Sequence, residues 1–255
     1  MSNEKEPEII HFHNLVPSKG KGKKTGGRLI HQGSVNGENY SVIATRATQN
    51  RKTGDMIQIW IILTDTHPSA AVDSGLDAST ICRGCPFAAG NGCYVLTHQA
   101  PAAIWRGLQR GIYPYLAPKD YSQFFGGRAV RFGAYGNPTL LPFSIAKAIA
   151  KESRGWTGYF HNWKEMPAAE AKQWNSLFMA STETKSSLDL AKGLNLRTFH
   201  VSPEKPEGFV ECLSETRNLE CAQCLLCQGT SKKAKPIWIN PHGSRVKKAV
   251  AEAAK

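Results

Sequence analysis

Two runs of apolar residues with β-type character begin the folded part of the chain. Residues 40–45 and 56–63 are rich in Val, Ile, Tyr and Trp, and the turn-forming residues 50–55 separate them. β-Branched and aromatic residues favour strands, whereas Gly, Asn and Asp favour turns. The pattern therefore predicts an N-terminal β-hairpin.

From residue 129 onward, strand-like and helix-like stretches alternate. Strands are expected at 130–135, 156–161, 177–181 and 197–201, and short additional strands at 209–210 and 237–239. Helices are expected at 100–110, 142–153, 167–174 and 185–194. Because parallel neighbours need crossover connections, this alternation predicts a mainly parallel sheet with helices between its strands.

The predicted fold class is α/β, with a partial or complete βα-barrel as the first arrangement and an open doubly wound sheet as the alternative. In both arrangements ligands bind at the carboxyl ends of the strands. Polar residues follow the expected strands in this chain: Asn137, His161, Asn162, Ser181, Thr182, Glu183, Ser202, Glu204 and His242. A ligand site is therefore expected at that end of the sheet.

The composition is that of a folded protein. The chain has 255 residues, 41% of them hydrophobic and 20% charged, which suits one large domain or two small ones. No stretch approaches the roughly 18 to 20 consecutive apolar residues of a membrane span, and the first residues lack the order of a secretory signal. We expect a soluble, cytoplasmic protein without membrane contact, and its oligomeric state is left open.

The formal net charge is +12, and the positive charges gather at both ends. Residues 17–28 hold five basic residues and no acid, while 229–255 hold seven basic residues and one acid. We interpret 1–28 as a flexible basic arm, 29–243 as a single α/β domain and 244–255 as a basic tail. Because basic residues release counterions from phosphates, the ends predict non-specific binding of DNA or RNA, with solvated tails as the alternative.

Seven cysteines fall into two groups. The first group is Cys82, Cys85 and Cys93, in loop 82–93, and the second is Cys212, Cys221, Cys224 and Cys227, in loop 212–227. An odd number of thiols in a chain without an export signal argues against a disulfide framework. Their clustering predicts metal binding instead.

The second group has the spacing of iron–sulfur proteins. Cys221, Cys224 and Cys227 are separated by two residues each, and Cys212 is the nearest candidate for a fourth ligand. Four thiolates complete either a 4Fe-4S cluster or a tetrahedral zinc site. Zinc modules usually pair two separated C-x2-C units, so the spacing favours iron, and zinc is the alternative.

The first group lies in a glycine-rich loop with little apolar bulk, so burial as inert small residues is the weaker explanation. Cys82, Cys85 and Cys93 are predicted to bind a cofactor, with His67, His98, water or a cysteine of the second group as the fourth ligand. A three-cysteine iron site leaves one iron atom open to a ligand. Whether the two groups share one metal site or form two is left open.

The order of a strand followed by three cysteines resembles the radical-SAM superfamily. Those proteins bind S-adenosylmethionine at the open iron of a 4Fe-4S cluster on a partial βα-barrel. Their usual signature is C-x3-C-x2-C, whereas this chain has C-x2-C-x7-C.

A set of motifs over residues 82–243 resembles an uncharacterised cysteine-rich family of phages and bacteria. The motifs lie at 82–86, 92–95, 103–114, 131–138, 155–161, 179–181, 197–199, 212–227 and 242–243. The resemblance implies a phage or mobile-element origin and a shared metal site. It supplies no reaction, so no catalytic residue is assigned.

Three functional hypotheses follow. The first is a cytoplasmic iron–sulfur protein that contacts nucleic acid through its basic ends, and the second is a zinc-stabilised nucleic-acid-binding module without catalysis. The third is a single-strand nickase, because His11 and His13 match the His-hydrophobic-His pattern that holds a divalent ion beside a tyrosine nucleophile. Tyr113, Tyr115 and Tyr121 are the candidate tyrosine nucleophiles for such a reaction.

Overall fold

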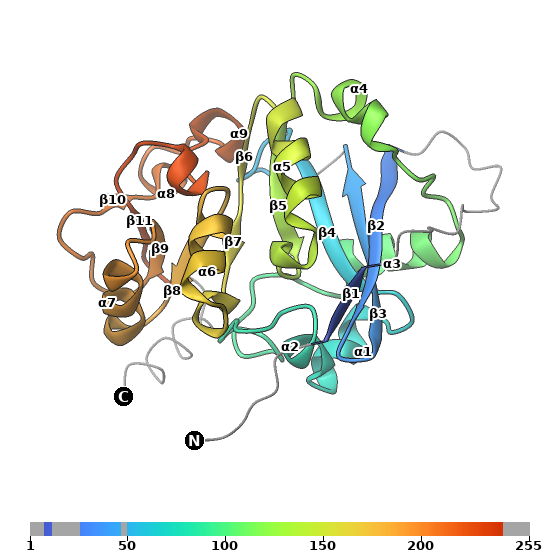
Figure 1. Cartoon of the computed structure of the whole chain (residues 1–255), viewed down its shortest axis with the longest axis horizontal. Coiled ribbons are helices and arrows are strands. Elements are labelled where there is room, and N and C mark those ends of the chain that lie inside the picture. Colours follow the sequence, from blue (N-terminus) through green and yellow to red (C-terminus); the bar gives the residue numbers. More distant parts are fainter. Residues whose placement is uncertain (1–7, 12–25, 47–49, 242–255) are drawn as a thin grey trace.

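The computed structural model describes residues 8–11, 26–46 and 50–241, and its strands form two sheets (Figure 1). The first sheet has six strands in the order β1-β2-β3-β4-β5-β6. Their bounds are Ile9–His11, Gly27–Val35, Glu38–Thr45, Ile57–Leu63, Ala129–Tyr135 and Gly155–Thr157. The predicted basic tail, His242 and most of the predicted basic arm lie outside the described residues.

The first three pairings of this sheet are antiparallel and the last two are parallel. Strand β3 pairs with β4 antiparallel, which confirms the predicted hairpin partners. A tighter hairpin joins β2 to β3 through Asn36 and Gly37, whose φ values of 51° and 82° suit a type I′ turn. Residues 9–11, expected in the arm, pair with β2 as an edge strand.

The second sheet has five strands in the order β10-β11-β9-β8-β7, and every pairing is parallel. In that order the bounds are Val210–Glu211, Ile237–Ile239, Thr198–Val201, Met179–Thr182 and Tyr159–Phe160. Only Gly158 separates β6 from β7, so one extended segment contributes to both sheets.

The α/β class is confirmed, but the expectation of one mainly parallel sheet needs correction. The chain forms a curled, mixed half-barrel sheet and a separate parallel sheet. The physical reason is that short turns connect the N-terminal strands, and a short turn can join only antiparallel neighbours. Crossover helices begin only after β4, which is connected to its parallel neighbour β5 through helices.

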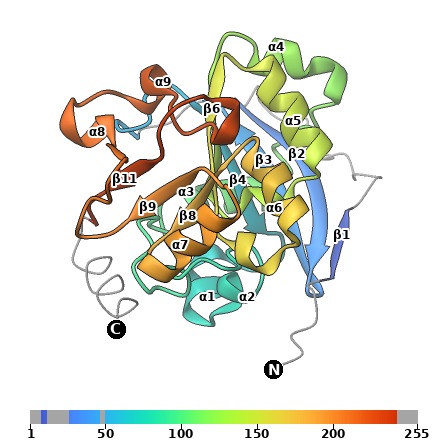
Figure 2. The same cartoon turned by 60° about the vertical axis from the view of Figure 1, so that its left-hand side comes forward.

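The helices cover the sheets (Figure 2). Helices α1 to α9 span Pro68–Asp73, Leu76–Ser79, Ala100–Gln109, Tyr121–Phe125, Phe143–Glu152, Ala168–Asn175, Lys185–Gly193, Leu213–Thr216 and Cys221–Cys224. Short 3-10 turns lie at Pro118–Asp120, Pro138–Leu140, Asn162–Glu165 and Gly229–Ser231. The four longest helices are the four that the periodicity predicts. Among the described residues, none of the helices has the length and apolarity to traverse a lipid bilayer.

The main core lies between these helices and the strands. It contains fully buried residues from both sheets, among them Ile59 of β4, Phe132 of β5 and Ala180 of β8. Trp163, which follows β7, is also fully buried, and its indole N–H donates a 2.8 Å hydrogen bond to the carbonyl of Ser181. Burial of this wide apolar surface is the main stabilising contribution.

Arg197 attaches the segment after β10 to the second sheet. Its side chain is buried and donates hydrogen bonds of 2.7 to 2.9 Å to four backbone carbonyls, those of Leu226, Gly229, Ala234 and Lys235. A planar guanidinium can serve several acceptors at once. This one residue therefore fixes the position of the segment that carries the second cysteine group.

Candidate functional site

A cavity of about 320 Å³ opens at the carboxyl ends of the parallel strands. Tyr135 at the end of β5, His161 after β7 and Val201 at the end of β9 line it. Five of the seven cysteines also line it: Cys82, Cys85, Cys93, Cys212 and Cys221. The structure thus places thiols of both groups at the end of the sheet where a ligand was expected.

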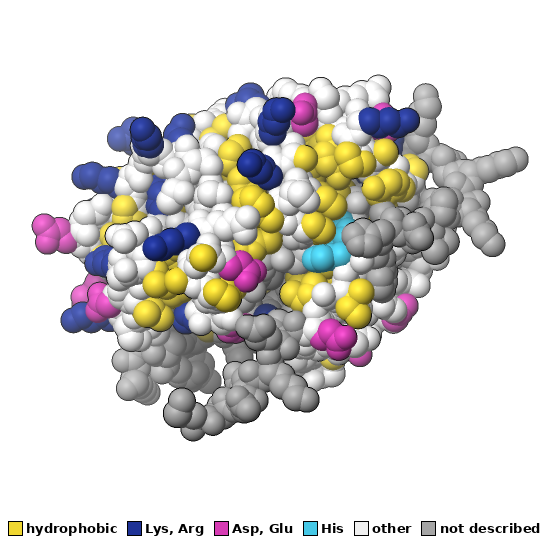
Figure 3. All heavy atoms as spheres, in the orientation of Figure 1, with side chains coloured by type: hydrophobic (Ala, Val, Ile, Leu, Met, Phe, Trp, Pro, Cys, Tyr) yellow, Lys and Arg dark blue, Asp and Glu magenta, His cyan; other side chains and the backbone are white. Residues whose placement is uncertain are grey.

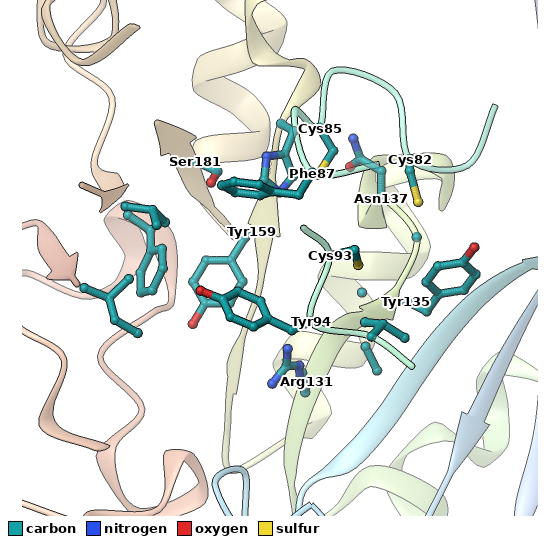
Figure 4. Close-up of a pocket in the computed structure, with 18 of the residues that line it drawn as sticks. Cys82, Cys85, Phe87, Cys93, Tyr94, Arg131, Tyr135, Asn137, Tyr159 and Ser181 are labelled. Carbon is teal, nitrogen blue, oxygen red and sulfur yellow. The ribbon is translucent and has the colours of Figure 1, made fainter. Parts of the chain in front are cut away.

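The first cysteine group lies on an irregular loop that closes one side of the cavity (Figure 4). The amide of Cys85 donates to the carbonyl of Cys82 at 3.1 Å, which makes a tight turn. Gly84 within that turn has a φ of 69°, and a Cβ there would lie 2.7 Å from the Cα of Asn162. Only glycine permits this close approach to the end of β7.

Two buried asparagines tie the cysteine loop to the strand ends. Asn137 donates from Nδ2 to Oδ1 of Asn162 at 2.8 Å, which links the segments after β5 and β7. The backbone amide of Asn137 donates to the carbonyl of Ile81, the residue before Cys82, at 2.6 Å. Asn137 also donates from Nδ2 to the carbonyl of Arg83, so the loop is held against the end of β5 by two hydrogen bonds from this residue.

A His–Glu ion pair lies next to Cys85. His161 Nδ1 lies 3.4 Å from Glu183 Oε1, and that carboxylate accepts a 2.7 Å hydrogen bond from Ser181. Burial alone would lower the pKa of His161, but the negative charges of Cys85 and Glu183 outweigh it and raise the pKa to about 10. A protonated His161 places its positive charge beside Cys85 and Glu183.

The thiols of each group influence one another. Burial raises the pKa of Cys82 well above its usual value, and the nearby Cys85 and Cys93 raise it further. Burial likewise raises the pKa of Cys227 to about 12; a hydrogen bond from Tyr159 opposes this, and the other three thiols of its group reinforce it. Grouped, buried thiols of this kind become thiolates readily only when a cation takes the place of their protons.

Not every predicted site residue lies in the cavity. Cys227 is buried against Met179 and Ile237, and Cys224 ends helix α9; neither lines the cavity. Among the described residues, no three His, Cys, Asp or Glu side chains are arranged to hold a single metal ion.

The histidines considered as metal ligands lie elsewhere. His67 caps helix α1 by accepting from the amide of Ser69 at 3.2 Å, and neither it nor His98 is among the residues described as lining the cavity. Of the nickase pair, His13 is outside the described residues. His11 Nδ1 lies 3.0 Å from His31 Nε2, on the edge strand of the first sheet.

Arg131 and the aromatic residues Tyr159 and Phe199 line the cavity but were not predicted as site residues. A bulge in β5 affects how this strand presents its side chains. Gln58 pairs with Arg131 and Trp60 with Tyr135, so β5 holds two more residues than β4 there, and Gly133 has a φ of 68°. A signal was present, because Arg131 is a lone charge between apolar neighbours on an interior strand.

Comparisons of the chain with protein-family models, with curated proteins and with solved structures found no match. The cavity is therefore the basis for assigning a function. Its chemistry combines thiols, aromatic rings and a guanidinium at the ligand-binding end of parallel strands.

Proposed function

We propose that the chain is an iron–sulfur protein in which Cys82, Cys85 and Cys93 hold a 4Fe-4S cluster at the cavity. The observation that carries this proposal is the placement of all three thiols on one loop that faces the carboxyl ends of the strands. Three thiolates leave one iron atom without a protein ligand. That iron, when the cluster is bound, would accept a ligand in the cavity and supply an electron to it.

The donor set fits such a group. Soft thiolates are the ligands that iron–sulfur clusters use. Burial is the main reason that the pKa of Cys82 is raised, and the nearby Cys85 and Cys93 add to it. A cubane cluster binds its cysteines at different iron atoms, so its ligands need not meet at one point. His161 adds positive charge next to Cys85 and would offset the charge of a bound cluster.

The second group is proposed to hold its own metal, an iron–sulfur cluster or zinc. Cys212 packs in one apolar cluster with Cys85 and Cys93 and in another with Cys227. The second site would therefore lie directly beside the first. A single site shared by both groups is the alternative.

The order of the parallel strands supports the likeness to radical-SAM proteins. Strands β4 and β5 are neighbours, as are β7, β8 and β9, and each neighbour follows in chain order. The first cysteine group comes after β4, the first strand of that series. A phage or mobile-element origin, and kinship with the cysteine-rich family, stay predictions from the sequence motifs.

Metal analysis tests the proposed function. Protein purified without oxygen should be brown, with a broad visible absorption and about four iron and four sulfide per chain for each cluster. Zinc in the second group would appear as about one zinc per chain. A colourless protein that takes up neither iron nor sulfide on anaerobic reconstitution would contradict the proposal.

Nucleic acid is the proposed partner of the basic ends. On the face drawn in Figure 3 the Lys and Arg side chains are dispersed and do not form one continuous patch. Replacing Lys19, Lys21, Lys23 and Lys24 by Gln should weaken binding to single- and double-stranded DNA. It should also flatten the salt dependence of the affinity, because a protein that makes fewer phosphate contacts releases fewer counterions on binding. Gel-shift titrations at several salt concentrations measure both quantities.

A matched variant separates clustered charge from net charge. Lys147, Lys151, Lys172 and Lys185 are exposed on helices α5, α6 and α7, and their replacement by Gln removes the same number of charges. We expect a smaller loss of affinity from this control. Equal losses in both variants would mean that the arm makes no contact of its own.

A further inference from the structure

One cation in the cavity, Arg131, has no anionic partner among the residues that the structure describes. Arg131 lines the cavity, and Figure 4 shows its guanidinium on the side where Tyr94 and Tyr159 lie. Within the described residues Arg131 takes part in no ion pair, and its buried Nε has no hydrogen-bond acceptor. A buried donor on a charged group is costly to leave unsatisfied, which points to an acceptor supplied by a ligand.

The other charged side chains that line the cavity differ from Arg131, because they have acidic partners. No Asp or Glu is among the described residues that line it, whereas Lys52, Arg131 and His161 are. Lys52 pairs with Glu215 and His161 with Glu183, so both of those cations have an acid outside the cavity. Arg131 is therefore the lining cation whose charge is available to a bound anion.

The apolar part of the wall suits an aromatic ring. Phe87, Tyr94, Tyr159 and Phe199 all line the cavity, and the rings of Tyr159 and Phe199 pack with their centroids 4.5 Å apart. Aromatic walls with few polar groups are typical of small-molecule sites, and a volume near 320 Å³ lies at the small end of their usual range.

We propose that Arg131 binds the anionic group of a small aromatic ligand whose ring packs against Tyr159 and Phe199. The shared chemistry is one phosphate or carboxylate joined to a planar ring, in a molecule about the size of a mononucleotide. Arg131 lines the same cavity as Cys212 and Cys221 of the second cysteine group. The inference rests on the proposed function in one respect: it places this ligand beside the cluster.

Two matched pairs of probes test the proposal on the full chain. Adenosine monophosphate and adenosine differ in a phosphate, and indole-3-acetate and indole differ in a carboxylate. By isothermal calorimetry the charged member of at least one pair should bind about 10- to 100-fold more tightly, as expected for a charge-assisted contact. The pair that shows the preference identifies phosphate or carboxylate as the natural group.

Substitutions assign the preference to Arg131. Arg131→Gln should abolish it, and Arg131→Lys should keep part of it, because lysine retains the charge without the planar fork. Arg106→Gln removes an equal charge from an exposed position on α3 and should leave the preference unchanged. Melting curves of all variants establish that each is folded.

Several outcomes would overturn the proposal. These are equal binding of charged and neutral probes, no binding of any probe at millimolar concentration, or a preference that survives in Arg131→Gln. Loss of iron from Arg131→Gln would also overturn it, because the guanidinium would then serve the metal site. Iron measured in every sample keeps the two proposals separate, since a wild-type chain without iron contradicts the cluster and still reports on anion binding.

Discussion

Methionine in place of Arg197 should lower the free energy of unfolding by roughly 3 to 5 kcal/mol. The buried guanidinium donates to four backbone carbonyls in the segment after β10. Methionine fills a similar volume but leaves those acceptors without donors, and an unsatisfied buried acceptor costs more than the hydrogen bond itself contributes. In a chain of this length the melting temperature should fall by about 10 °C.

Thermal and urea denaturation measure the effect, and Arg154→Met is the matched control. Arg154 is exposed and donates one 3.0 Å hydrogen bond to the carbonyl of Ala222, so its loss should cost less than about 1 kcal/mol. Arg197→Lys should fall between the two, since an ammonium cannot serve four separated carbonyls. Equal destabilisation by both methionine variants would show that the four contacts do not hold the segment.

The elements from residue 100 onward could be predicted from hydrophobic periodicity. The helices at 100–110 and 185–194 and the strands at 130–135 and 197–201 all form within a few residues of their expected bounds. Their apolar residues recur with the period of the element that they form, so the local pattern and the packing agree. The hairpin of β2 and β3 carries an equally local signal, because Asn36-Gly37 is the residue pair typical of a type I′ turn.

The division into two sheets depends on contacts that no local pattern contains. Gly158 interrupts the strand between β6 and β7, and a Cβ there would lie 2.4 Å from the ring of Phe178. The bulge at Gly133 is likewise defined by its pairing with β4, a strand about 70 residues earlier. Neither residue differs in sequence terms from an ordinary glycine in a strand.

The cysteine groups were visible in the sequence, but their common cavity was not. More than a hundred residues separate Cys93 from Cys212, and their proximity follows from the position of β9 and β11 beside the cysteine loop. Arg131 was missed for a related reason. Its lone charge on an apolar strand was visible in the sequence, whereas the absence of Asp and Glu among the described residues that line the cavity is seen only in the structure.

Serine substitutions in the two cysteine groups are expected to remove different metals. Serine at Cys85 should abolish most of the iron of the first site, because a neutral hydroxyl is a poor substitute for a thiolate ligand. Serine at Cys227 should instead remove the metal of the second site, and iron, sulfide and zinc analyses of anaerobic protein measure both. Tyr94→Phe, on the same loop as Cys85, retains every thiol and serves as the control.

The same variants should differ in stability. The second group lies in the segment that Arg197 fixes to the sheet, and Cys227 is buried against Met179 and Ile237. Metal binding there should contribute directly to folding, so Cys227→Ser should lower the melting temperature more than Cys85→Ser. A greater loss from Cys85→Ser would place the structural metal at the first group.

The pattern of loss also distinguishes two sites from one. Cys212 packs in apolar clusters with cysteines of both groups. A single metal cluster bound by both groups is therefore the main alternative to two adjacent sites. With two sites, each substitution removes only its own share of the metal, and the double variant Cys85→Ser with Cys227→Ser removes the sum. With one shared site, either single substitution removes all the metal and the double variant adds nothing, because ligands of one centre do not act independently. We expect the additive result.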